Sequence, residues 1–181
     1  TLGCIAAGLG SASMTEVIDP TRLARCSAAV EDILAMIRTR GTSEGHLTKW
    51  LGSEEVDASL LAVVGPLSVI SVGTALGRNT IDAVEAELAE DGGVHRYRHD
   101  TFYGGGQWPL LTCFLGLAHL EAGSRELATE CLRWAASTAD ADDQLPEQVG
   151  WHLLDPSMVD EWVERWGPVA NPLLWSHAMY V

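Results

Sequence analysis

Apolar side chains recur along most of the chain at intervals of three and four residues, the spacing that places them on one face of an α-helix. The pattern is clearest between residues 20 and 40, where Asp19 and Pro20 form a helix start and Gly41 forms a helix stop. We therefore predict a long amphipathic helix over these residues. Its buried stripe should consist of Leu23, Val30, Ile33, Leu34 and Ile37.

Similar signals predict the other helices. We expect them over residues 2–12, 58–64, 79–89 (starting at Asn79 or Thr80), 108–121, 125–137 and 156–166, with a last helix starting at Asn171-Pro172. The core face of the helix over 125–137 should consist of Leu127, Ala128, Cys131, Leu132, Trp134 and Ala135. Residues 45–55 read as a short hairpin or an irregular loop, and residues 138–150 as a polar loop. Strand patterns are scarce and no repeat of fixed period is visible, so the sequence predicts an all-α fold of six to eight paired helices.

Composition narrows the class of protein. The 181 residues are 47% hydrophobic, which suffices for one domain with a sizeable core. The formal net charge of −14 argues against nucleic acid and anionic membranes as partners, because both require basic patches. We find neither an apolar run long enough for a membrane span nor a signal-peptide pattern, and expect a cytoplasmic protein.

The four cysteines, Cys4, Cys26, Cys113 and Cys131, stand singly without metal-ligand spacing. We expect them to be buried thiols, as suits a reducing compartment. Thr1 opens directly into an apolar helix without an initiator methionine, so we expect the chain to be part of a larger protein.

Chemistry is concentrated in the segment 94–108, VHRYRHDTFYGGGQW. It combines a guanidinium, a carboxylate, several aromatic rings and three glycines. Arginine donates hydrogen bonds in a rigid fork while aromatic rings cover C–H surface, so such a loop can hold a sugar. Two further stretches carry similar residues, LPEQ at 145–148 and NPLLWSHA at 171–178.

Together these stretches resemble the glucoamylase family, glycoside hydrolase family 15. Its fungal members carry Arg-Tyr-x-x-Asp-Thr-Tyr-Tyr-x-Gly-x-x-Trp, and residues 96–108 here, RYRHDTFYGGGQW, have the same spacing from Arg to Trp. The family's base loop is similar to residues 146–148, and its closing Thr-Trp-Ser-Tyr-Ala helix resembles residues 174–178. Residues 57–61 are similar to a helix of bacterial members.

The resemblance covers nearly the whole chain and implies that residues 1–181 are the C-terminal half of an (α/α)6 barrel, with the N-terminal half of the same barrel as its partner. In the family the general acid is a glutamate in a Trp-Glu-Glu motif that precedes a helix similar to residues 1–12. That glutamate is absent here. Glu147 matches the general base, although its polar loop alone would suggest a solvated surface carboxylate.

The resemblance also implies a set of substrate-binding residues: Arg96, Tyr97, Asp100, Phe102, Trp108, Gln148 and Trp175. Asp100 is expected to orient Arg96 or the loop backbone, and the alternative for the pair is a surface ion pair. Phe102 replaces a family tyrosine and lacks its hydroxyl. For Trp108 and Trp175 the alternative is an ordinary core position.

Other aromatic and imidazole side chains carry weaker signals. Trp151, Trp162 and Trp166 follow the base loop and are either core or part of a leaving-group subsite; we favour core. The histidines lack metal spacing, so we expect no metal, and the resemblance implies no cofactor. His177 stands where the family has a tyrosine. The four histidines considered are His95, His99, His152 and His177.

The resemblance implies an exo-acting, inverting α-glucoside hydrolase that releases β-glucose from the non-reducing end of a glucose-containing oligosaccharide. Inversion needs an acid and a base whose carboxyl groups lie roughly 6.5–9.5 Å apart. The glycine-rich rim at 104–108 resembles bacterial forms that act on small α-1,6 glucosides, so isomaltose is the expected substrate. The alternatives are an α-1,4-acting glucoamylase, a trehalase of the same family, or a non-catalytic carbohydrate-binding helical barrel. Lanthionine-cyclase-like or terpene-type barrels would need metal ligands or an aspartate-rich helix, which we do not find.

Overall fold

The computed structural model describes residues 1–15 and 19–181 and is built almost entirely of helices. The α-helices are α1 (Leu2–Ala12), α2 (Pro20–Arg40), α3 (Leu61–Val64), α4 (Ala75–Leu88), α5 (Pro109–Glu121), α6 (Arg125–Ser137), α7 (Val159–Trp166) and α8 (Leu174–Tyr180). Short 3-10 helices are η1 (Ala58–Leu60), η2 (Phe102–Gly104) and η3 (Pro156–Met158). The strands are β1 (Thr42–Ser43), β2 (His46–Leu47), β3 (Ala89–Glu90) and β4 (Gly93–Val94). The predicted all-α class is confirmed.

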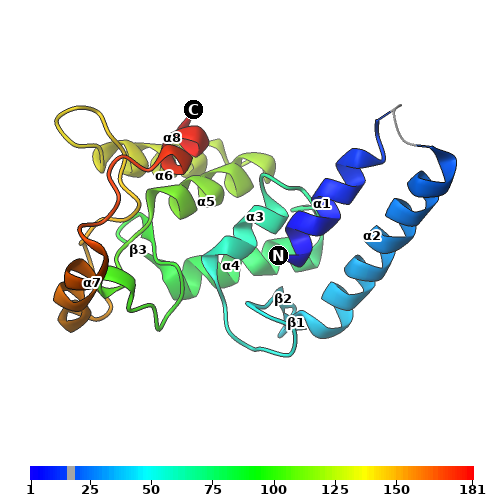
Figure 1. The fold of residues 1–181 in the computed structure, drawn as a ribbon, viewed down its shortest axis with the longest axis horizontal. Helices are drawn as coiled ribbons and strands as arrows, with labels where there is room; N and C mark the ends of the chain where they lie inside the picture. The colour runs from blue at the N-terminus through cyan, green and yellow to red at the C-terminus, as the bar shows by residue number, and fades with distance from the viewer. Residues whose placement is uncertain (16–18) are drawn as a thin grey trace.

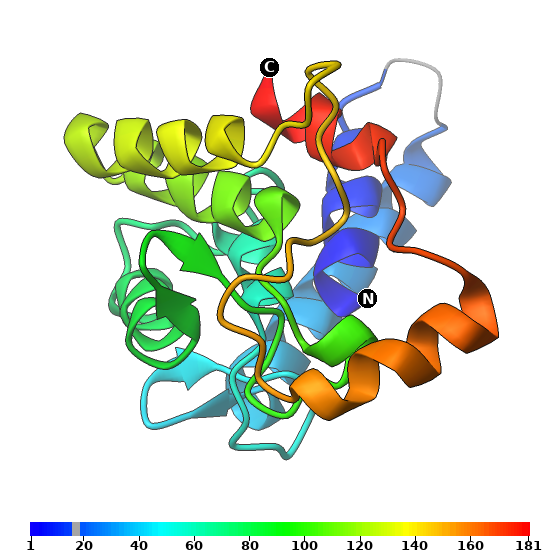
Figure 2. The same ribbon diagram turned by 90° about the vertical axis from the view of Figure 1, so that its left-hand side faces the viewer.

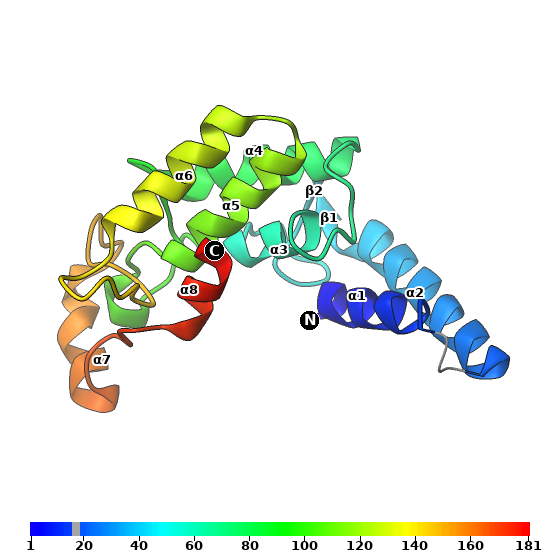
Figure 3. The same ribbon diagram turned by 90° about the horizontal axis from the view of Figure 1, so that it is seen from above.

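The helices form an open arc of paired layers (Figures 1 and 3). Helices α1 and α2 lie side by side at one end, α3 and α4 occupy the middle, and α5 packs against α6 and α8 at the other end. Each pair of strands is a two-stranded antiparallel hairpin, β1 with β2 and β3 with β4. For residues 45–55 the alternatives were a short hairpin or an irregular loop. The hairpin β1–β2 includes only residues 45–47 of this segment, and residues 48–55 form no helix or strand.

The core lies along α5, where ten of the thirteen residues are buried. Helices α3, α6 and α8 all pack on α5, so a helix in this place needs apolar side chains on every side. Helix α4 adds the buried side chains of Ile81, Val84 and Leu88. The predicted end of α5 at residue 121 and the predicted start of α6 at residue 125 are also confirmed.

Helix α2 begins and ends as predicted. Its N-cap Asp19 accepts hydrogen bonds from the backbone N–H groups of Thr21 and Arg22, at 3.0 and 3.1 Å. Its apolar stripe, however, is buried only at Ile37, and Leu23 is 36% exposed. The stripe prediction was wrong in extent because α2 lies at the edge of the arc and packs mainly on α1.

Three other predictions need correction. Helix α4 begins at Ala75, because Thr74 caps it by accepting a hydrogen bond from the N–H of Gly77 at 3.1 Å. The last helix begins at Leu174 rather than at 171. On α6 the predicted core face is buried only at Cys131 and Ala135, since Leu127 and Leu132 are each 42% exposed.

Burial of the cysteines is also only partly as expected. Cys113 and Cys131 are buried, Cys26 is half-buried, and Cys4 is exposed. Burial raises the pKa of Cys113 to about 11 and that of Cys131 to about 12, so both remain thiols at neutral pH. Within residues 1–15 and 19–181, no helix has the length and apolar character that crossing a membrane requires.

Gly93 is among the glycines whose surroundings leave no room for a side chain. A Cβ at Gly93 would lie 2.7 Å from Cδ of Gln107 and would also run into the Trp134 indole. We expect Gly93→Ala to lower the free energy of unfolding by about 1–3 kcal/mol through overpacking. Gly8→Ala is the control, because nothing lies within 4 Å of its added Cβ and alanine favours the helix by about 0.5–1 kcal/mol. Denaturant unfolding measures both, and equal stability of the two variants would contradict the packing argument.

Candidate active site

The loop between β4 and α5 is closed at its base by backbone hydrogen bonds. The N–H of Trp108 donates to the carbonyl oxygen of Val94 at 2.9 Å, and His95 pairs with Gln107 in an isolated antiparallel bridge. Gln107 pairs in turn with Val149, which joins this loop to the segment after α6. Two stretches that are distant in sequence therefore meet beside the start of α5, as the yellow-to-orange segment in Figure 2 makes visible.

Arg96 and Asp100 form a bidentate pair inside this loop. Arg96 donates from Nε to Oδ2 at 2.8 Å and from Nη2 to Oδ1 at 2.6 Å. The Asp100 side chain is fully buried, whereas that of Arg96 is 30% exposed. Asp100 also accepts from the N–H of Phe102 at 3.0 Å. Asp100 thus orients Arg96 and the backbone together, and the pair is not a simple surface ion pair.

This geometry leaves donors of Arg96 available. A guanidinium carries five N–H groups, and Asp100 takes two of them, so three remain for a ligand. Burial lowers the pKa of Arg96, but the hydrogen bonds and charge of Asp100 outweigh that effect and raise it. The group is therefore a permanent cation at the surface of the site.

Three aromatic rings surround this guanidinium. The Cζ atom of Arg96 lies 5.1 Å from the ring centroids of Tyr97, Phe102 and Trp108. The rings of Phe102 and Trp108 stack at 6.2 Å. Trp108 is only 7% exposed, so most of its indole belongs to the core cluster. The combination of a fixed cation and flat apolar faces is the one expected of a sugar site.

Glu147 is held by contacts to the segment around α8. Its N–H donates to the carbonyl oxygen of Ala170 at 2.8 Å. On its N-terminal side, Ser176 donates to the carbonyl oxygen of Pro146 at 2.9 Å, and the N–H of Leu145 donates to Nε2 of His177 at 2.9 Å. The stretch resembling the family's last helix therefore supports the base loop.

The electrostatics of Glu147 link it to the arginine pair. Burial raises the pKa of this half-buried carboxyl group, the charge of Arg96 lowers it, and the charge of Asp100 raises it further. The net direction is upward. A carboxylate whose pKa is raised toward neutrality is a better proton acceptor than a solvated one.

Gln148 joins the two loops. Its Oε1 accepts from the N–H of Gly106 at 2.8 Å, and its Nε2 donates to the carbonyl oxygen of Phe102 at 3.0 Å. The side chain is 4% exposed, so both ends of the amide are engaged within the protein. The structure supports a role of Gln148 in holding Glu147 next to the Arg96 loop, while its predicted contact with sugar stays a prediction.

The tryptophans differ in their surroundings. Trp175 is 57% exposed and meets the Phe114 ring edge-on at 6.2 Å, without a contact to the Arg96 loop among those found. Trp162 is half-buried, with its ring 4.9 Å from that of Phe102. Trp151 and Trp166 are 44% and 70% exposed. The preference for core positions therefore fits Trp162 and is wrong for Trp151 and Trp166.

Two residues near the site gave no usable signal in the sequence. Lys49 places Nζ 3.1 Å from the ring centroid of Tyr97, and burial together with Asp100 raises the pKa of that phenol. His95 lies buried behind the glycine-rich turn. The contact of Lys49 joins segments that are far apart in the chain, and the contact of His95 with Gly105, ten positions away, depends on how the loop folds. Among the described residues, no cluster of three or more His, Cys, Asp or Glu side chains could hold a metal ion.

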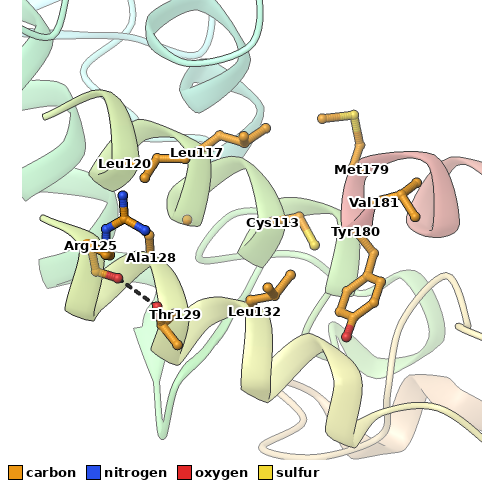
Figure 4. A pocket seen from close by; sticks show the side chains of 11 residues that line it. Cys113, Leu117, Leu120, Arg125, Ala128, Thr129, Leu132, Met179, Tyr180 and Val181 are labelled. Carbon is orange, nitrogen blue, oxygen red and sulfur yellow. Dashed lines mark hydrogen bonds between the residues drawn. The ribbon is translucent and has the colours of Figure 1, made fainter. Parts of the chain in front are cut away.

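A cavity of about 260 Å³ lies elsewhere, between α5, α6 and the end of α8 (Figure 4). It is lined mainly by apolar side chains, including Cys113, Leu117 and Met179. Its lining includes no residue of the Arg96 loop or of the base loop, so it is separate from the candidate active site.

No protein-family model matches the chain. The isomaltose glucohydrolase of Kribbella flavida is 48% identical over 185 residues, which span 100% of this chain and 47% of that protein. The chain thus spans about half the length of the curated relative it matches.

Solved structures agree. A wild-type glycosidase superposes with a TM-score of 0.95 at 45% identity, over 99% of this chain and 48% of its own. A variant glycosidase in complex with glucose gives a TM-score of 0.95 at 44% identity, over the same shares.

A more distant structure agrees in fold alone. A bacterial glucoamylase complexed with acarbose gives a TM-score of 0.77 at 21% identity, over 99% of this chain and 32% of its own. The predicted half of an (α/α)6 barrel is confirmed by this likeness. Because 48% identity to a glycoside hydrolase extends over the whole chain, the chain belongs to the glucoamylase family of glycoside hydrolases.

Proposed function

We propose that the complete protein containing this chain is an inverting, exo-acting α-glucoside hydrolase with isomaltose and short α-1,6-linked glucosides as substrates. The observation that carries the proposal is the half-buried Glu147: burial raises the pKa of its carboxyl group, and the charges of Arg96, which lowers that pKa, and of Asp100, which raises it, act on the same group. The isomaltose glucohydrolase that is 48% identical supports the choice of substrate. The likeness to the glucoamylase at 21% identity supports the fold only, so we place α-1,4 glucans and trehalose second.

In this proposal each residue has a defined task. Glu147 removes a proton from the water that attacks the anomeric carbon, and a glutamate of the upstream Trp-Glu-Glu motif protonates the leaving oxygen. Arg96 donates its remaining N–H groups to sugar hydroxyls, while Phe102 and Trp108 cover the C–H face of the ring. No step requires a cofactor.

The base assignment is tested by substitution. We expect Glu147→Gln in the complete protein to lower kcat for isomaltose by about 10²- to 10⁴-fold, the contribution typical of a general base. Glu130→Gln, on the exposed face of α6, is the control and should retain wild-type activity. Glucose release is the measurement, with isomaltose, maltose, panose and trehalose as substrates. Normal turnover by Glu147→Gln would remove Glu147 from the mechanism.

The stereochemistry can be read directly. We expect proton NMR during the first turnovers to detect β-glucose, because a water activated by Glu147 attacks from the face opposite to the leaving group. Initial release of α-glucose would contradict inversion.

The charge of Asp100 leads to a prediction about the pH dependence of activity. Since Glu147 acts when deprotonated, activity is present above its raised pKa and is lost as the pH falls through it. Asp100→Asn removes a charge that raises this pKa, so we expect the acid limb of the kcat/KM profile to move to lower pH. Asp142→Asn, in the exposed part of the polar loop, should leave the limb in place. A shift to higher pH would be incompatible with the electrostatics described.

The proposed partner is tested by complementation. We expect this chain alone to release no glucose, and co-expression with the N-terminal half of the same barrel to restore activity, because the general acid would come from that half. Activity of the chain alone would overturn this division of the site.

A further inference from the structure

A histidine lies directly behind the glycine-rich turn of the candidate active site. His95 is 3% exposed and precedes Arg96 in the chain. Its Nδ1 lies 2.9 Å from the carbonyl oxygen of Gly105. A carbonyl oxygen only accepts hydrogen bonds, so Nδ1 must carry the proton and act as the donor.

The other ring nitrogen faces a carboxylate. Nε2 of His95 is buried without a hydrogen-bond partner among the described residues, and it lies 3.7 Å from Oε2 of Glu90. The other oxygen of Glu90 lies 3.3 Å from Nδ1 of His152, whose Nε2 is 3.3 Å from Oδ2 of Asp91. One carboxylate on the β3–β4 hairpin therefore stands between two histidines, one before the Arg96 loop and one after the base loop.

The backbone at Gly105, which His95 contacts, has little free space around it. Gly105 has a φ of +69°, and a Cβ there would collide with the carbonyl oxygen of Asp100. The next residue, Gly106, donates its N–H to Gln148, the neighbour of Glu147. A displacement of Gly105 would therefore be transmitted to the base loop on one side and to the partner of Arg96 on the other.

We propose that His95 is a positioning residue: its Nδ1–H group, on a ring whose Nε2 lies 3.7 Å from the Glu90 carboxylate, fixes the Gly105 carbonyl and thereby sets, through Gly106 and Gln148, the place of Glu147. The kinetic part of this inference rests on the proposed function, whereas the link between His95 and the glycine turn does not. The residue touches no substrate and acts only through the loop.

Kinetics of the complete protein test the positioning role. We expect His95→Ala to lower kcat for isomaltose at least about tenfold with KM changed less than about threefold, because a misplaced base affects the reacting state more than binding. His95→Asn keeps an amide N–H near the position of Nδ1 and should regain a large part of the loss. Glu90→Gln should lower kcat several-fold.

Another buried histidine provides matched controls. His119 is 5% exposed, its Nε2 lies 3.1 Å from Oε1 of Glu85, and it stands near the far end of α5 from Trp108. We expect His119→Asn and Glu85→Gln to keep kcat within about twofold of wild type, even where they lower the melting temperature. These controls distinguish the general effect of losing a buried histidine from the specific effect of losing the contact between His95 and the Gly105 carbonyl.

A second readout is independent of activity. Hydrogen exchange of peptides covering residues 103–108, followed by mass spectrometry, should become at least about tenfold faster in His95→Ala and remain unchanged in His119→Asn. If His95→Ala does not fold, His95→Phe, which keeps a ring without an N–H donor, takes its place in both measurements. If the wild-type complete protein has no glucosidase activity, the proposed function is wrong. Hydrogen exchange at residues 103–108 would then be the remaining test of whether His95 holds the glycine turn. Unchanged exchange at 103–108, a normal kcat in His95→Ala, or no recovery in His95→Asn overturns the positioning role.

Discussion

The buried carboxylate of Asp100 is the constraint on which the candidate site depends. A fully buried charge is costly unless it is paired and hydrogen-bonded, and here the guanidinium of Arg96 and a backbone N–H meet that requirement. The same pairing leaves the guanidinium only partly covered, with its remaining donors fixed in direction. One interaction therefore neutralises the buried charge, orients the arginine and contributes to the electrostatic environment of Glu147.

The described residues contain only two-residue strands and isolated bridges, so regular strand pairing holds little of the site. Side-chain hydrogen bonds hold its loops instead. Backbone groups of a buried loop still need hydrogen-bond partners. Gln148 supplies them for Phe102 and Gly106, His95 for Gly105, and Ser176 for Pro146. The helices provide a rigid frame, and these few polar side chains define the shape of the loops upon it.

The surface of the arc fits the proposal that the chain works with a second half. Large apolar side chains are exposed at both ends of the arc, among them Leu174 at 81% and Trp166 at 70% at one end and Ile5 at 45% at the other. Contiguous exposed apolar groups often mark surfaces that bind another part of a protein. The relative that matches is about twice as long, since this chain spans 47% of it. The base and the acid would then come from opposite halves, and closing the barrel would bring them together.

The sequence by itself determined what depends on near neighbours. The Asp19 cap and the apolar period located α2 and α5, and the resemblance of residues 96–108 to a known family loop led to the expectation that Asp100 orients Arg96. Only the tertiary structure decided which amphipathic faces are buried, because burial depends on the helices that pack nearby: α5 is enclosed, whereas α2 lies at an edge. It also decided the link from Gln148 to Gly106 across 42 positions, since contacts between distant segments leave no periodic trace in the chain, and the contact of His95 with the Gly105 carbonyl, which depends on how the loop folds.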